Sequence, residues 1–257
     1  MRYFLKLAYN GEKYFGWQIQ TNAISVQEVL TKTLSLLLKE DIDITGAGRT
    51  DTGVHAHEFY AHFDTSAQFT AEIKSEFIQR LNSFLPSDIV VYDILSVQES
   101  AHARFDALNR TYKYYVIAQK DPFSLSFAHR VYCSLDMESM NICCQRLLEY
   151  SDFTSFSKVH TQTKTNNCRI THALWTSSAD GVFVFEITAD RFLRNMVRAI
   201  VGTLLDVGRG KMTVEQFCNI IEQKDRSAAG TSVPAKALFL EKITYPDHIW
   251  LHKDKDK

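Results

Sequence analysis

The chain has 257 residues, of which 45% are apolar and 23% charged, and its 29 Lys and Arg side chains nearly balance its 30 Asp and Glu side chains. This composition excludes a disordered or collagen-like chain, and the length allows one large domain or two small ones. No apolar run approaches the ~20 residues that a membrane span needs, and residues 1–7 lack the apolar block of a signal peptide, so we expect a cytoplasmic protein. Five cysteines without C-x-x-C spacing predict reduced thiols rather than disulfides or a zinc site.

The first hundred residues alternate between the periodicities of strands and helices. The predicted elements are a strand at 2–9, a helix that opens at the capping box 25–28, strands at 41–45 and 59–64, a helix around 73–81 and a strand at 89–97. The apolar faces of the two helices are predicted to comprise Val26, Val29, Leu30, Leu34, Leu37 and Leu38, and then Ile73, Phe77, Ile78 and Leu81.

The second half predicts a similar order of elements. They are a strand at 111–118, a helix from about Asp136, a hairpin of strands 170–177 and 182–189 around Asp180-Gly181, a helix from about Phe192 that Gly208 and Gly210 end, a shorter helix from Thr213 and a strand at 238–245. The helix from Asp136 should direct Met140, Cys143, Cys144, Leu147 and Leu148 inward, and the helix from Phe192 should direct Leu193, Met196, Val197, Ile200, Val201, Leu204 and Leu205 inward.

Two successive β-α-β-β-α-β units predict an α+β fold of two tandem ferredoxin-like halves with antiparallel sheets. We place the N-terminal half at residues 1–105 and the C-terminal half at 106–257. Because no Pro- or Gly-rich linker separates them, the halves are expected to flank a central active-site cleft.

Charge is distributed unevenly along the chain. Residues 1–110 carry 10 basic and 14 acidic side chains, whereas residues 111–257 carry 19 and 16. Five cations lie close together in the second half against only Asp190 and Asp206, and they are Arg191, Arg194, Arg198, Arg209 and Lys211. Such a stretch attracts phosphates, although a solvated helix face has the same pattern.

The glycine-rich segment 46–56 lies between two predicted strands. Three glycines within eight residues let the backbone bring Arg49 and Asp51 close to a ligand, and a plain surface loop with an Arg/Asp pair is the alternative. The segment is not a P-loop, because it lacks the required arrangement of glycines and lysine.

This segment resembles the signature loop of the TruA family of tRNA pseudouridine synthases. The matching motifs follow one another in order: Tyr9-Asn10-Gly11 through Phe15-Gly16-Trp17-Gln18, Gly48-Arg49-Thr50-Asp51-Thr52-Gly53-Val54-His55-Ala56, His102-Ala103-Arg104-Phe105 through Arg110-Thr111-Tyr112-Lys113-Tyr114, Asp152-Phe153-Thr154-Ser155-Phe156, and Phe192-Leu193-Arg194-Asn195-Met196-Val197-Arg198 through Gly208-Arg209-Gly210-Lys211. The resemblance covers nearly the whole chain. It departs from the family at Phe59, where Gln is usual, and at Ala237, where Gly is usual.

The resemblance implies an enzyme that converts uridine to pseudouridine in the anticodon stem-loop of tRNA, with Asp51 as the catalytic nucleophile. The reaction moves uracil from an N1 to a C5 glycosidic bond and needs an ionised carboxylate, which an adjacent guanidinium favours. The resemblance implies that Arg198 supplies this guanidinium. By the same resemblance, Tyr112 stacks on the uracil and acts as an acid or base, and Leu238 contacts the other face of the base. Arg49 enters the space that the uridine leaves.

The resemblance also implies a homodimer that binds tRNA without a cofactor, and we expect Arg191 and Arg194 to bind the RNA. Three of the predicted site residues also have a plainer structural interpretation. Arg198 could be a solvated helix residue, Tyr112 a core residue of its strand, and Leu238 an ordinary packing residue. The only possible metal cluster, His55, His57, His62 and Asp64, lacks a suitable ligand spacing, so no metal is expected.

Two other functions stay open from the sequence. One is a non-catalytic RNA-binding module that uses the open faces of its sheets. The other is a palm-like nucleotidyl transferase, which needs at least two carboxylates to hold Mg²⁺, whereas the glycine-rich segment offers only Asp51.

Overall fold

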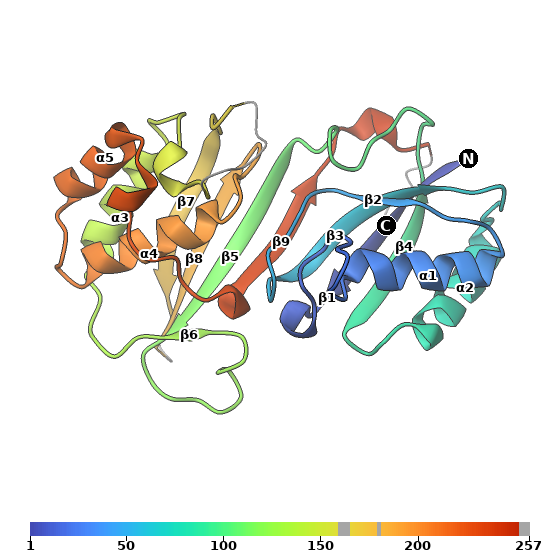
Figure 1. Cartoon of the computed structure of the whole chain (residues 1–257), viewed down its shortest axis with the longest axis horizontal. Coiled ribbons are helices and arrows are strands. Elements are labelled where there is room, and N and C mark those ends of the chain that lie inside the picture. The colour runs from blue at the N-terminus through green and yellow to red at the C-terminus, as the bar shows by residue number, and fades with distance from the viewer. Residues whose placement is uncertain (159–164, 179–180, 252–257) are drawn as a thin grey trace. The chain divides into compact units, whose positions relative to one another are not determined.

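The computed structural model describes residues 1–158, 165–178 and 181–251, and it has an α+β architecture (Figure 1). The chain forms two compact units. The first comprises Met1–Leu108 together with the segment that begins at Leu240, and the second comprises Asn109–Phe239. Most of the C-terminal strand is therefore counted with the first unit, while its first two residues belong to the second, and the division into domains at residue 105 stays a prediction.

The first unit contains the predicted order of elements. They are β1 (Arg2–Tyr9), α1 (Val26–Leu38), β2 (Ile44–Gly46), β3 (His55–Asp64), α2 (Ala71–Phe84) and β4 (Ile89–Ser96). Strand β1 pairs antiparallel with β3 and β4, and β2 pairs antiparallel with the end of β3. Strand β2 begins later than predicted, because the N–H of Ile42 donates to the hydroxyl of Ser35 at 3.0 Å instead of joining the ladder.

Helix α1 begins at its predicted cap, and only part of its predicted apolar face is buried. The Ser25 hydroxyl accepts from the N–H of Glu28 at 3.2 Å, as the capping box predicts, while the Glu28 carboxylate pairs with Lys32 at 2.5 Å. Val26 and Leu30 are buried with Leu34, whereas the predicted inward residues Val29, Leu37 and Leu38 are only half-buried.

The buried face of helix α2 differs from the predicted one. Its Leu81 is buried, but Ile73 is 52% exposed. The helix is tied to β4 near its C-terminal end, where the Asn82 side chain donates to the carbonyl of Val91 and accepts from its N–H, both at 2.8 Å. The first turn also contacts β4, through the ion pair of Lys74 with Asp93 at 2.9 Å, yet Ile73 lies at the surface.

The second unit contains β5 (Asn109–Ile117), β6 (His129–Arg130), α3 (Met137–Leu147), β7 (Ile170–Ser177), β8 (Val182–Ala189), α4 (Met196–Gly208) and α5 (Val214–Gln223). Strand β8 lies between β5 and β7 and pairs antiparallel with both, which confirms the predicted hairpin. Gly181 has φ +72°, and Asp180 lies outside the described residues. Strand β6 was not predicted, since its two residues are too few to show a period.

The three helices of this unit pack together and against the sheet, with α3 on β7 (Figure 1). In α3, Met140, Cys143, Cys144 and Leu147 are buried as predicted, but Leu148 lies beyond the helix and is exposed. All five cysteines are free, as expected. Helix α5 begins after Thr213, which forms a complete capping box with Gln216.

Helix α4 begins four residues later than predicted. Asn195 adopts a left-handed conformation with φ +66° and caps the helix, which starts at Met196. Most of its residues are buried around the whole circumference, so α4 is a core helix rather than an amphipathic one. As a consequence, Arg194 precedes the helix instead of lying on it, and Arg191 precedes it as the sequence predicts.

Strand β9 (Leu238–Thr244) completes the described elements. In the first unit, the Ile243 N–H of this strand donates to the Glu58 carboxylate at 3.2 Å. Among the helices within residues 1–158, 165–178 and 181–251, none has the length and hydropathy of a membrane span.

Candidate active site

The glycine-rich segment connects β2 to β3 in the first unit and forms a tight turn around Asp51. The Val54 N–H donates to the Asp51 carbonyl at 3.1 Å, and Gly53 takes φ +77°, which only glycine adopts without strain. Arg49 is exposed and Asp51 is half-buried. The Asp51 carboxylate is thus the acidic group of a loop whose backbone has a defined conformation.

The Tyr9–Trp17 segment packs against this loop on both sides of Asp51. Before Asp51, the Tyr9 hydroxyl and the Thr50 hydroxyl lie 2.9 Å apart in a hydrogen bond. After Asp51, the Gly53 N–H donates to the Tyr14 carbonyl at 3.3 Å. These contacts bring together two motifs that are separated by about 40 residues.

Two glycines permit this close approach. A Cβ atom on Gly11 would lie 2.0 Å from the Val54 carbonyl oxygen, and a Cβ atom on Gly16 would lie 2.2 Å from the Thr50 carbonyl oxygen. Gly16 also has φ +86°. Any side chain at these positions would displace the loop that carries Asp51.

Phe59, which stands where the resembled family usually has Gln, is fully buried. Its ring stacks on Trp17 with centroids 4.2 Å apart, and it contacts the Tyr9 ring at 5.6 Å. Trp17 in turn lies against Gly46, where a Cβ would come within 2.3 Å of the indole nitrogen. The departure is therefore absorbed by aromatic packing.

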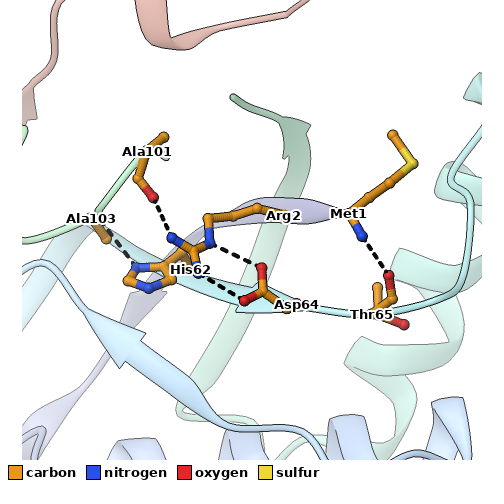
Figure 2. Close-up of polar contacts among 7 residues, drawn as sticks. All are labelled: Met1, Arg2, His62, Asp64, Thr65, Ala101 and Ala103. Atoms are coloured by element: carbon orange, nitrogen blue, oxygen red, sulfur yellow. Dashed lines mark hydrogen bonds and ion pairs between the residues drawn. The ribbon is translucent and has the colours of Figure 1, made fainter. Parts of the chain in front are cut away.

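The motif that begins at His102 is anchored at the start of β1 and the end of β3, as Figure 2 shows. The Arg2 guanidinium binds the Asp64 carboxylate through two nitrogens, at 2.9 and 2.7 Å, and donates to the Ala101 carbonyl at 3.0 Å. The Ala103 N–H donates to Nδ1 of His62 at 3.1 Å. Burial, and then the charge of Arg2, lower the pKa of His62 to about 4, so the imidazole is a neutral acceptor at pH 7.

The other two histidines of β3 also have partners of their own. His55 Nδ1 accepts from the Gly11 N–H at 3.0 Å, and His57 Nδ1 lies 2.9 Å from the Glu241 carboxylate. In the part of the chain that the structure describes, no three His, Cys, Asp or Glu side chains come together as a metal site.

Tyr112 lies on β5 of the second unit, opposite Ile187 of β8, and is half-buried. Its ring meets that of Phe192 edge to face, with centroids 5.1 Å apart. The core tyrosine of this strand is instead Tyr114, which is fully buried and donates to the Pro234 carbonyl at 2.9 Å. The structure therefore separates a structural tyrosine from Tyr112, which lies beside the segment that leads into α4.

Arg198 lies in the first turn of α4 and is half-buried. Its Nε donates to the Val233 carbonyl at 2.8 Å, and the Val233 N–H donates back to the Arg198 carbonyl at 3.2 Å. The interpretation of Arg198 as a solvated helix residue without a partner is wrong. Gly202, one turn later, allows this approach, because a Cβ there would lie 1.9 Å from the Thr231 carbonyl oxygen.

The basic stretch divides between the two ends of α4. Arg191 and the exposed Arg194 precede the helix, where its dipole adds positive potential. Arg209 and Lys211 follow the helix and share the Asp206 carboxylate, at 3.5 and 3.9 Å. The N-terminal end therefore carries the stronger positive field.

Leu238 is the first residue of β9 and is buried, as is Ala237 before it, the second departure from the resembled motifs. Within the first unit the structure brings Arg49 and Asp51 onto one loop. Within the second unit it gathers three predicted arginines, Arg191, Arg194 and Arg198, around the start of α4, with Tyr112 beside them through Phe192.

Sequence reasoning assigned no role to Phe192 or Val233. Phe192 belongs to one of the motifs that carry the resemblance, so the sequence held a signal for its place beside Tyr112. Val233 had none, because its contribution is a backbone carbonyl that any residue type supplies.

A family model described as tRNA pseudouridine synthase matches residues 144–246. Three bacterial proteins named tRNA pseudouridine synthase A are similar over nearly the whole chain. The Parabacteroides distasonis protein is 54% identical over 98% of this chain and 99% of its own length. The Bacteroides thetaiotaomicron protein is 56% identical over 99% and 94%, and the Porphyromonas gingivalis protein is 53% identical over 97% and 99%.

Proposed function

The chain belongs to the tRNA pseudouridine synthase A family, isomerases that make pseudouridine in tRNA, and from this premise we propose that it acts on uridines of the anticodon stem-loop with Asp51 as its nucleophile. The observation that carries the proposal is the arrangement of the Asp51 loop. It offers a single carboxylate, and the Tyr9–Trp17 segment holds the loop on both sides of that residue.

The reaction explains why one positioned carboxylate is enough. The N1 glycosidic bond of uridine breaks, the same uracil rejoins the sugar through C5, and the C5 hydrogen is lost to solvent. A carboxylate that attacks the sugar or adds to the uracil ring forms a covalent intermediate, which divides this exchange into two easier steps. A loop of fixed conformation supplies the necessary alignment.

Arg198 is the proposed charge partner of the Asp51 carboxylate. Its hydrogen bond to the Val233 carbonyl orients the guanidinium. Tyr112 stacks on the uracil and moves a proton, Leu238 contacts the opposite face of the base, and Arg49 fills the place of the turned-out uridine.

The partners follow from the charge of the second unit. Arg191 and Arg194 bind phosphates of the tRNA, helped by the positive end of the α4 dipole. The enzyme works in the cytoplasm as a homodimer and without a cofactor. Its fold is two ferredoxin-like halves, residues 1–105 and 106–257, and the antiparallel β4-β1-β3-β2 arrangement of the first unit supports this topology.

Tritium release from tRNA that contains 5-tritiated uridine tests the function. The wild-type chain should release tritium, and Asp51→Asn should lower the rate by several orders of magnitude because it removes the nucleophile. Asp43→Asn, an exposed carboxylate change just before β2, is the matched control and should be fully active. Residual activity of Asp51→Asn above about one percent of wild type would contradict the nucleophile assignment. Tight tRNA binding by a wild-type chain that releases no tritium would indicate an RNA-binding module.

A further inference from the structure

A long segment of the second unit presents aromatic rings to solvent. It runs from the end of β5 through β6 to the start of α3 (Figure 1), and we call residues 118–136 the aromatic loop. Phe123 is 90% exposed and Tyr132 is 83% exposed. Large aromatic side chains contribute most to binding free energy when a partner removes them from water. Two exposed rings on one loop therefore indicate a surface that a partner covers.

The backbone of the aromatic loop is held in place. The Val131 N–H donates to the Ile117 carbonyl at 2.9 Å, which extends the parallel pairing of β6 with β5. The Asp121 carboxylate accepts from the Phe123 N–H at 3.1 Å, and the Lys236 ammonium donates to the Leu125 carbonyl. The rings are therefore presented by a structured segment, which lowers the entropic cost of binding.

Cations accompany the rings. The Arg130 guanidinium lies 4.5 Å from the centroid of the Tyr132 ring, a cation–π distance. Before Arg130, β6 also carries the half-buried His129, whose pKa is lowered by burial first and then by the charges of Arg209 and Lys236. These two cations are thus close enough to act on the loop, and Asp206 offsets part of the charge of Arg209.

We propose that the aromatic loop binds unpaired nucleotides of the tRNA at a distance from the isomerised uridine. Bases stack on Tyr132 and Phe123, and the phosphates between them contact Arg130, since this combination of rings and cations is how proteins bind single-stranded RNA. This inference rests on the proposed function, which supplies tRNA as the partner.

The strand sets the distance from the chemistry. Tyr112 and Ile117, the last residue of β5, are five positions apart, or roughly 16 Å along the strand. Strand β6 runs parallel to β5 with Arg130 opposite Ile117, so Tyr132 lies beyond that point, whereas the middle of the loop returns to Phe239 through Phe127, with ring centroids 6.2 Å apart. Tyr132 therefore contacts nucleotides other than the one that stacks on Tyr112.

A protein surface is the other partner that exposed rings attract. The arginine over Tyr132 and the cations around His129 favour a polyanion, because an apolar protein interface would bury these charges at a cost. We therefore assign the loop to RNA and treat a protein interface as the result that would overturn the proposal.

The test compares tRNA affinity among variants of the full chain. Phe123→Ala combined with Tyr132→Ala should weaken tRNA binding by about 5- to 150-fold for each stacked base lost, while the single-turnover rate at saturating tRNA stays at the wild-type value. Tyr132→Phe keeps the ring and should bind normally. Tyr92→Ala, which removes an exposed ring from β4 of the first unit, is the matched control and should also bind normally.

A salt titration adds an independent readout. Arg130→Ala should make the dependence of log affinity on log salt shallower by about one unit, as expected for one lost phosphate contact. Unchanged tRNA affinity in the double variant would overturn the proposal. So would a change in sedimentation of the RNA-free protein with tRNA affinity preserved, which would assign the rings to a protein interface. Neither result bears on tritium release by the wild-type chain, so failure of this inference is distinguishable from failure of the proposed function.

Discussion

Replacing Gly16 with alanine should disable the enzyme without unfolding it. The new Cβ would lie 2.2 Å from the Thr50 carbonyl oxygen, whereas real Cβ contacts stay beyond 3.0 Å, so the two segments must separate by at least 0.8 Å, the difference between these distances. The φ of +86° adds roughly 1 to 2 kcal/mol of backbone strain for a non-glycine residue. Since a rigid peptide unit joins Thr50 to Asp51, the carboxylate moves with the loop.

A displacement near 1 Å is enough to lower a catalytic rate by about 10²-fold, because the reacting groups leave their near-attack geometry. Single-turnover tritium release at saturating tRNA should therefore fall by about that factor in Gly16→Ala. Gly48→Ala changes the same loop at a position where nothing lies within 4 Å of the new Cβ, and it should retain the wild-type rate.

A second variant weakens the same contact without adding an atom. Tyr9→Phe removes the hydroxyl that binds Thr50 without adding an atom, so it loosens the same contact in a chain that folds normally, and a smaller fall in rate is expected. Circular dichroism should show all three variants folded. If Gly16→Ala and Tyr9→Phe both turn over at the wild-type rate, the Tyr9–Trp17 segment does not position Asp51.

Three further predictions concern single groups of the site and its support. Tyr112→Phe should bind tRNA normally yet lower single-turnover rates by about 10² to 10⁴ if the hydroxyl moves a proton, and near-wild-type rates would leave Tyr112 as a stacking residue. Arg191→Ala with Arg194→Ala should weaken tRNA binding and flatten its salt dependence by roughly one unit per lost phosphate contact; an unchanged slope would place the RNA elsewhere. The folded-state pKa of His62, about 4, lies below the ordinary value, so the unfolded chain takes up the proton first as pH falls. The contribution of neutral His62 to the free energy of unfolding is complete above about pH 6.5, and roughly 2 to 3 kcal/mol of it is lost as the pH falls toward 4. Urea unfolding at pH 7 and 4.5 should therefore show a smaller loss of stability for His62→Gln than for wild type.

Local signals in the sequence predicted most of the elements. The cap residues Ser25 and Thr213 place the starts of α1 and α5, and alternation defines the β7–β8 hairpin. These signals succeed because a cap or a turn involves residues that are close in sequence. The start of α4 was missed because the left-handed conformation of Asn195 is fixed by its surroundings, including a 2.6 Å hydrogen bond to Ser232.

For the candidate site, too, some features are evident from the sequence and others only from the fold. The order of amino acids is enough to show the glycine-rich loop, its single carboxylate Asp51 and the resemblance that implies a reaction for the loop. The hydrogen bonds of Tyr9 with Thr50 and of Arg198 with Val233 follow from the folded chain. These contacts join residues 41 and 35 positions apart, and one of them uses a backbone carbonyl, which leaves no trace in residue type or spacing. Such contacts depend on how strands and helices pack, which periodicity along the chain does not record.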